Sequence, residues 1–350
     1  MGDRIIRRGR GLASFPQPAE IHPSNYPTSM AITEMGRLIE GYSDGKLSMK
    51  LYAGGQLGEE RDTLEMTTFG GIDMNRVSLG PLNSIEPMTN IPGLPFIFKN
   101  VAHMRDAMDG APGRQVLRSL EPHGLIGLCF YDSGARSFYN TKRPIRKPED
   151  MKGMKLRVQN SDLFVSLIQE LGGNPTPMPL GEVYQSLVQG VIDGAENNWP
   201  SYFEGRHFEA AKYYSLTQHV IAPELLVMSR QRWEKLSASE QEIVRKSADE
   251  SVPYMRKLWD LKTLDAEKAV RASGVEVNEV DDQQAFVDRV QPVWKPGDFV
   301  DSRRRSRRDD VDCRLAGLCP LYSQRQSKLV GTDGAPVDDL VRRARVCRRI

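Results

Sequence analysis

The sequence lacks the features that mark a membrane protein, a metalloprotein or a common enzyme. No run of apolar residues approaches the roughly 18 needed to span a bilayer. There is no H-x-x-x-H spacing, no phosphate-binding loop, no G-x-S-x-G and no C-x-x-C motif. We therefore expect no catalytic constellation, no cofactor and no metal site. The five histidines are scattered and are expected to be ordinary surface or loop residues: His22, His103, His123, His207 and His219.

Cysteine is scarce and unevenly placed. Cys129 is alone in the first 300 residues, whereas Cys313, Cys319 and Cys347 lie near the end. Cys129 has no partner for a structural disulfide and no neighbouring His that would indicate a nucleophile. Its apolar surroundings, Leu125–Phe130, predict a small buried core residue.

Charge is also distributed unevenly. The net charge is +2, but residues 301–350 hold twelve Arg, one Lys and seven Asp, so that this segment is +6 and the rest is −4. A mildly acidic body gives no reason to expect a nucleic-acid partner. From about residue 295 the hydrophobic pattern disappears. This tail can be interpreted as a disordered basic arm that binds nucleic acid or another anionic surface, or as an out-of-frame translation, which its Arg-rich, Lys-poor composition favours.

The remaining chain predicts an α/β protein. It is 39% apolar and long enough for two domains. Strands alternate with helices, and the almost uniformly apolar Leu125–Tyr131 is typical of a strand covered on both faces. Residues 1–20 have no periodicity and are expected to be disordered or wrongly assigned. A capping box at Ser237–Glu240 predicts a long helix that reaches about Ser273.

The pattern of the segment Met151–Tyr202 predicts a strand, a helix, a loop, a second helix and a second strand, in that order. Lys155–Val158 alternates as a strand, and Ser161 is expected to cap the following helix. Arg157 is flanked by apolar residues in this strand, and a half-buried guanidinium needs an anion. The anion is either an internal Asp or Glu or the carboxylate of a ligand, and the residues alone leave both alternatives open.

Two motifs in this segment carry a resemblance to a known family. They are K-L-R-V at Lys155–Val158, and E-V-Y-x-x-L-x-x-G-V-I-D-G at Glu182–Gly194, which is followed by Asn197. Across roughly residues 22–294 the chain resembles the extracytoplasmic solute-binding proteins of tripartite ATP-independent periplasmic (TRAP) transporters. The resemblance implies that Arg157 forms a two-pronged salt bridge to the ligand's carboxylate and that Asn197 lines the pocket.

The resemblance also implies a two-lobed periplasmic-binding-protein-like fold. Each lobe would be a mixed sheet flanked by helices, and a long helix would lie across both. Lobe 1 would come mainly from residues 21–145 and lobe 2 mainly from residues 146–230. Residues 231–294 would hold the long helix and a return segment that packs on both lobes, and residues 295–350 would be the atypical tail.

The amino-acid sequences of Tyr131–Asn140 and Asp73–Ser78 are similar to those of family members that bind hexuronates such as glucuronate and galacturonate. We expect Arg136 to make a second contact to the acid or to a ring hydroxyl. A bidentate Arg suits the carboxylate and Asn suits hydroxyls. Further hydroxyl contacts are expected from Glu60, Asn75, Arg76, Ser78 and Asn198, stacking from Tyr26, Trp199 and Tyr202, and a position facing the cleft for His22. Alternatively, Arg76 and Glu60 pair with each other or with neighbouring charges.

The expected function is therefore binding and delivery without bond breaking. The protein would be periplasmic and monomeric, although the sequence shows no clear export signal. Its lobes would close over a sugar acid, and the closed form would dock on a TRAP membrane permease. Two other functions compete with this one. A sugar-acid-processing enzyme would need a base with a shifted pKa or a metal, and a nucleic-acid-binding or anion-binding protein would use the basic tail.

Overall fold

The fold is organised around a single mixed β-sheet. The structure is a computed structural model that describes residues 13–14 and 17–294, all of which belong to one compact unit. Within this part of the chain the sheet has eight strands in the order β2-β4-β9-β5-β8-β6-β7, with β10 also paired to β9. The strands are β2 (Pro18–Ala19), β4 (Met74–Ser78), β5 (Leu125–Asn140), β6 (Lys155–Val158), β7 (Asn174–Pro177), β8 (Gly194–Asn197), β9 (Tyr213–Ser229) and β10 (Glu276–Asn278); β1 (Ala13–Ser14) pairs separately with β3 (Leu47–Ser48).

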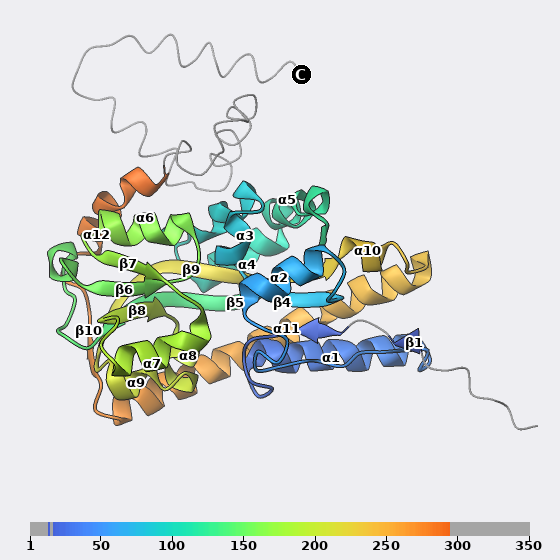
Figure 1. Cartoon of the computed structure of the whole chain (residues 1–350), viewed down its shortest axis with the longest axis horizontal. Coiled ribbons are helices and arrows are strands. Elements are labelled where there is room, and N and C mark those ends of the chain that lie inside the picture. The colour runs from blue at the N-terminus through green and yellow to red at the C-terminus, as the bar shows by residue number, and fades with distance from the viewer. Residues whose placement is uncertain (1–12, 15–16, 295–350) are drawn as a thin grey trace, which may run out of the picture. The chain divides into compact units, whose positions relative to one another are not determined.

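Helices cover both faces of the sheet (Figure 1). Helices α3 to α6 lie on one side, while α1, α11 and the short α7 to α9 lie on the other. None of the helices in the described ranges is both long and apolar enough to cross a membrane. Their bounds are α1 Pro27–Tyr42, α2 Glu60–Thr68, α3 Leu79–Asn83, α4 Val101–Asp109, α5 Ala111–Ser119, α6 Asp162–Glu170, α7 Val183–Val188, α8 Trp199–Glu204, α9 His207–Ala210, α10 Arg230–Trp233, α11 Ala238–Ala272 and α12 Gln283–Arg289.

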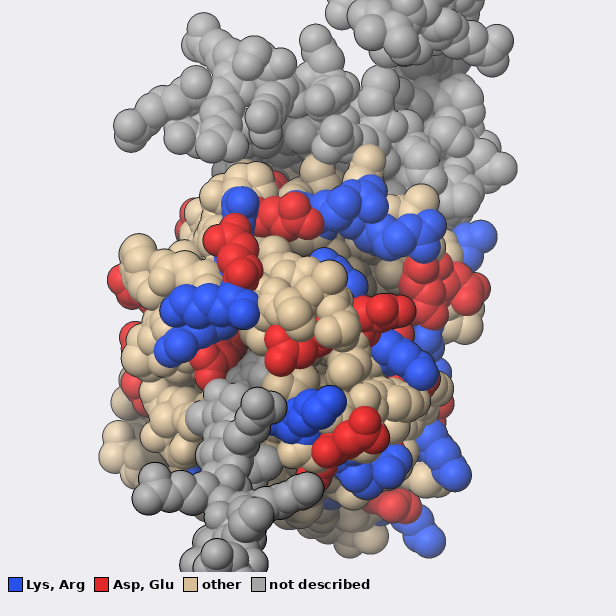
Figure 2. Space-filling view, turned by 90° about the vertical axis from the view of Figure 1, so that its right-hand side faces the viewer, with Lys and Arg blue, Asp and Glu red and all other residues tan. Residues whose placement is uncertain are grey.

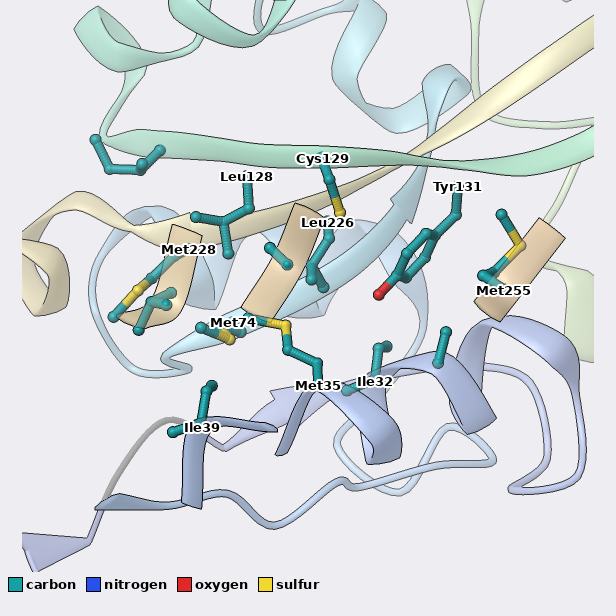
Figure 3. Packing of buried hydrophobic residues seen from close by; sticks show 14 of the residues in the cluster. Ile32, Met35, Ile39, Met74, Leu128, Cys129, Tyr131, Leu226, Met228 and Met255 are labelled. Carbon is teal, nitrogen blue, oxygen red and sulfur yellow. The ribbon is translucent and has the colours of Figure 1, made fainter. Parts of the chain in front are cut away.

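Two of the hydrophobic clusters lie at opposite ends of the long strands β5 and β9. The first cluster joins α1, β4 and the near ends of β5 and β9, where Met35, Met74 and Leu226 meet (Figure 3). The second cluster contains Tyr139 and Tyr214 from the other ends of the same strands. Helix α11 contributes to both, which confirms the prediction of a long helix packed across two lobes.

The long helix begins as its sequence predicts. The Ser237 hydroxyl accepts a hydrogen bond from Glu240 N, and the Glu240 side chain accepts one from Ser237 N. Two other expectations, one about Cys129 and one about a buried strand, are confirmed or extended. Cys129 is a free, buried thiol in the first cluster. The apolar strand expected at Leu125–Tyr131 continues to Asn140, because the polar side chains of its second half are buried and hydrogen-bonded.

Two local predictions are wrong. Ser161 occupies the N-cap of α6, but its side chain makes no capping bond, because its hydroxyl lies 2.8 Å from the side-chain amide of Asn83. The expected disorder through residue 20 also fails at its end, because Pro18–Ala19 pairs with β4 and Glu20 is buried. The proposed basic or out-of-frame tail, residues 295–350, lies outside the described residues.

The surface mixes charges of both signs. Figure 2 shows Lys and Arg interspersed with Asp and Glu on the face that carries α10 and the start of α11, at the right of Figure 1. A nucleic-acid-binding face needs a continuous basic patch. This side of the described body does not have one.

Candidate functional site

Arg157 is a buried cation without a carboxylate partner in the described ranges. It lies on β6 between β7 and β8 and is 3% exposed. Its Nε and Nη2 atoms donate hydrogen bonds to Met178 O at 2.9 and 2.8 Å. Burial lowers the pKa of Arg157, while the more distant Glu196 carboxylate raises it. The internal salt bridge that the sequence left open is therefore not formed by any described residue.

Arg136 provides the contrast because its charge is neutralised internally. Its Nε and Nη2 atoms donate to the two carboxylate oxygens of Glu196 at 2.5 and 2.8 Å. Nη1 donates to Ser133 Oγ at 3.3 Å, and His219 Nε2 lies 3.6 Å from the same carboxylate. Burial alone would raise the pKa of Glu196, but Arg136 and His219 outweigh it and lower that pKa to about 2.

Arg76 is fully buried among three carboxylates. Its guanidinium contacts both carboxylate oxygens of Glu20, and lies 2.8 Å from Glu60 and 3.1 Å from Glu224. Burial would raise the pKa of Glu20, but the charge of Arg76 holds it well below its usual range. The alternative in which Arg76 and Glu60 pair with each other thus describes the observed contact, and Glu20 and Glu224 join it.

Sequence reasoning missed Glu20 and Glu224. Glu20 fell in the segment that was expected to be disordered. Glu224 offered the better signal, because a single acid within the buried strand β9 needs a partner for the same reason as Arg157 in β6.

Glu60 is held rigidly through one of its two oxygens. Oε1 accepts hydrogen bonds from Ser78 N at 3.0 Å, from Ser78 Oγ at 2.9 Å and from Arg76 Nη1 at 2.8 Å. Within the described ranges no donor is bonded to Oε2. Nearby, Asn75 donates to Thr63 Oγ1 at 3.0 Å and so joins β4 to α2. Glu60 therefore presents one carboxylate oxygen with unused accepting capacity.

The two asparagines at the end of β8, Asn197 and Asn198, make different hydrogen bonds. Asn198 caps α8 by accepting a hydrogen bond from Ser201 N at 2.8 Å, and it donates to Ser133 O at 2.8 Å. Asn197 accepts a bond from Asn198 N at 2.9 Å. No acceptor in the described ranges is bonded to the Asn197 amide nitrogen, so this group has donor capacity left.

The aromatic residues predicted to stack on a sugar pack mainly on protein. His22 stacks on Tyr26 with ring centroids 3.9 Å apart, and His22 Nδ1 lies 2.9 Å from Glu20 Oε1. Trp199 stacks on Tyr214 at 3.9 Å. The Tyr202 hydroxyl donates to Ala211 O at 2.5 Å, and the residue is 0% exposed. Tyr202 therefore has no exposed ring surface in this structure.

Polar contacts join the segments that carry the two halves of the site. The hydroxyls of Tyr26 and Ser201 are hydrogen-bonded at 2.9 Å. Gly80 N donates to Gln159 Oε1 at 3.2 Å, only two residues from Arg157. Glu60 also acts on Arg157 electrostatically by raising its pKa. The guanidinium of Arg157, which has no carboxylate partner in the described ranges, and the carboxylate of Glu60, which has one oxygen without a donor, therefore lie in the same region.

His207 is buried at the start of α9, so the expectation that it is a surface or loop residue is wrong, and its burial leads us to expect a pH effect. Its Nδ1 is 2.7 Å from the Tyr139 hydroxyl, and burial followed by the charge of Arg157 lowers the pKa of His207 to about 3. The unfolded chain binds this proton near pH 6.5, so folding stability should fall as the pH drops from about 6.5 towards 3. At about 1.4 kcal/mol per unit of pKa difference, the loss should reach a few kcal/mol.

Denaturant titrations of wild type and His207→Gln between pH 7 and pH 4 would check this expectation. The variant should show a shallower pH dependence. His103→Gln, at a partly exposed position on α4, is the matched control and should leave the slope unchanged. Parallel curves for wild type and His207→Gln would contradict the assignment.

A model of the family described as "Bacterial extracellular solute-binding protein, family 7" matches residues 19–299. The chain belongs to this family. A "Solute-binding protein" of Chromohalobacter salexigens is 42% identical over 274 residues, which cover 78% of this chain and 82% of the relative. The family is one of extracellular binding proteins, in agreement with the resemblance seen in the sequence.

Solved structures of family members superimpose closely on this chain. A TRAP periplasmic solute-binding protein from a Bradyrhizobium species, in complex with α/β-D-galacturonate, is 47% identical with a TM-score of 0.82 and covers 87% of this chain and 99% of its own. A TRAP protein from Chromohalobacter salexigens with bound D-glucuronate is 39% identical, also with a TM-score of 0.82, and covers 87% and 99%. These matches confirm the predicted fold class.

Proposed function

We propose that this family member is the solute-binding protein of a TRAP transport system and captures a hexuronate such as glucuronate or galacturonate. The observation that carries the proposal is the buried Arg157 guanidinium, which has no carboxylate partner in the described ranges. A buried cation without a counter-ion costs free energy. A ligand carboxylate offers the planar, two-pronged partner that an Arg fork fits best.

The rest of the site suits a polyhydroxylated acid better than a dicarboxylate. Glu60 Oε2 accepts hydrogen bonds from hydroxyls, and the Asn197 amide donates to them. A second ligand carboxylate near Glu60 would be repelled, because two carboxylates at short range disfavour each other's charged forms. The two relatives described above bind uronates, which have one carboxylate and several hydroxyls.

The proposed mechanism is capture by lobe closure, followed by delivery to a membrane permease in the periplasm, with no bond broken. Closure is favoured when the ligand makes contacts that exist only in the closed state. Arg157 from one half and Glu60 from the other are the two groups whose joint engagement would supply such contacts.

A thermal-shift screen of the full chain tests the proposal. The compounds are glucuronate, galacturonate, the neutral sugars glucose and galactose, and succinate as a simple dicarboxylate. A uronate at about 100 times its dissociation constant should stabilise the fold by about 2.7 kcal/mol and raise the melting temperature. The neutral sugars and succinate should have little effect. An equal shift with galactose or succinate, or no shift with either uronate, would contradict the proposal.

NMR spectra of each uronate incubated with the protein separate binding from catalysis. Line broadening without new signals is expected for a binding protein. The appearance of product resonances would instead support an enzyme that processes sugar acids.

A further inference from the structure

Helix α11 exposes large apolar side chains on the face that points away from the protein. Tyr254, Leu261 and Leu264 are 38%, 53% and 64% exposed. With 3.6 residues per turn, they lie on a different side of the helix from Met255 and Trp259, which are buried against the body. Single exposed apolar residues need no explanation, but three along one face of a helix form an exposed apolar surface that a partner helix can cover.

These residues follow the spacing of a helix–helix seam. The outer face is formed by positions three and four residues apart, and a repeat of this kind over seven residues is the pattern by which two helices pack together. We call it the outer seam. It contains Tyr254, Lys257, Leu258, Leu261, Leu264, Asp265 and Lys268.

The charged residues of the outer seam have no ion-pair partner in the described part of the chain. This holds for Lys257, Asp265 and Lys268, although other charges on α11 are paired. Asp260 contacts Arg105 at 2.6 Å. The seam therefore retains charges that a partner can neutralise.

We propose that the outer seam binds a second copy of the same chain, with the two α11 helices antiparallel and a two-fold axis beside Leu261. In this arrangement each residue before Leu261 in one copy lies level with a residue after Leu261 in the other copy. The two residues are separated from Leu261 by the same number of positions. Lys257 then stands level with Asp265, about 6 Å along the helix from Leu261. Leu258 stands level with Leu264.

The same symmetry places Tyr254 level with Lys268 of the other copy, a pairing that permits a cation–π contact. Apolar side chains of one copy thus face apolar side chains of the other, and each Lys faces either an Asp or an aromatic ring. This self-complementarity favours a second copy over an unrelated partner, because an arbitrary partner would not require the seam to match itself under a two-fold axis.

The proposal departs from the monomer expected from the sequence, and it is independent of the proposed ligand. No residue of the outer seam belongs to the candidate site. A single helix seam buries less than the roughly 1,600 Å² of a standard interface, so the dimer should be reversible.

Sedimentation equilibrium of the full chain tests the proposal over about 1 µM to about 1 mM, the range of weak to moderate association. The weight-average mass should rise from one copy towards two. Leu261→Glu brings two carboxylates together at the axis and should hold the mass at one copy. The matched control is Val188→Glu on α7, where the side chain is 55% exposed, and it should dimerise like wild type. A single-copy mass for wild type across the range overturns the proposal.

Charge reversal then tests the pairing itself. Lys257→Glu and Asp265→Lys should each weaken the dimer at least tenfold, because each places like charges level with one another. The double variant Lys257→Glu/Asp265→Lys restores opposite charges and should recover the wild-type dissociation constant. A double variant as weak as the single ones would rule out this antiparallel register.

Discussion

Arg157→Met should abolish most uronate binding without destabilising the ligand-free protein. The variant removes the proposed two-pronged contact, and breaking such a buried charge pair costs about 2–5 kcal/mol. At about 1.4 kcal/mol per factor of ten, affinity should fall by at least 30-fold. The ligand-free melting temperature should be equal or higher, because the wild-type guanidinium is buried without a counter-ion.

Isothermal titration calorimetry and thermal melts of the same samples would measure both effects. Arg157→Lys keeps the charge but not the fork, so its affinity should lie between those of wild type and Arg157→Met. Arg37→Met, at an exposed position on α1, is the control and should change neither quantity. Retention of full affinity by Arg157→Met would remove the main support for the proposed ligand class.

Arg76→Met should have the opposite signature, a large loss of stability. Arg76 is as deeply buried as Arg157, but it forms ion pairs with Glu20, Glu60 and Glu224. Removing one partner of a buried ionic group costs about 3–5 kcal/mol, because the remaining charges stay desolvated without compensation. Comparison with Arg157→Met controls for the loss of a buried guanidinium as such.

The loss in Arg76→Met should shrink on acidification. In wild type Arg76 lowers the pKa of Glu20, so the stability from this pair is present above the carboxyl's unfolded pKa and is lost as the pH falls. Without Arg76, burial would raise the pKa values of Glu20 and Glu224, and protonation would then relieve their buried charge. Urea titrations at pH 7 and pH 4 should therefore show a smaller stability difference between the two proteins at pH 4. A constant difference at both pH values would contradict this account.

The difference between these two arginines shows where sequence reasoning stops. The pattern of apolar neighbours around Arg157 predicts its strand correctly, because alternation is a local property. It does not predict whether a carboxylate lies nearby, since that depends on strands distant in the chain. Glu196 pairs with Arg136 and Glu60 pairs with Arg76, and neither forms an ion pair with Arg157 in the described residues.

The apolar pattern predicts only the first half of β5, because the polar residues of its second half are paired with residues distant in the chain. Asp132 and Arg136 look like the start of a loop in the sequence, yet both are buried and paired. Their partners, Arg105 and Glu196, lie in other elements and are invisible to a local pattern. The family motifs identified the fold, while the pairing of buried charges required coordinates.

The passage of β5 and β9 through both core clusters has a consequence for protein engineering. Both strands contribute residues to both clusters, so cutting the chain at one point should not yield two foldable pieces. A chimera that takes its second lobe from a relative, in order to change ligand preference, must exchange the ends of β5 and β9 together with the intervening elements. Recombination libraries should place their crossovers in pairs that keep the antiparallel partners of these strands from the same parent.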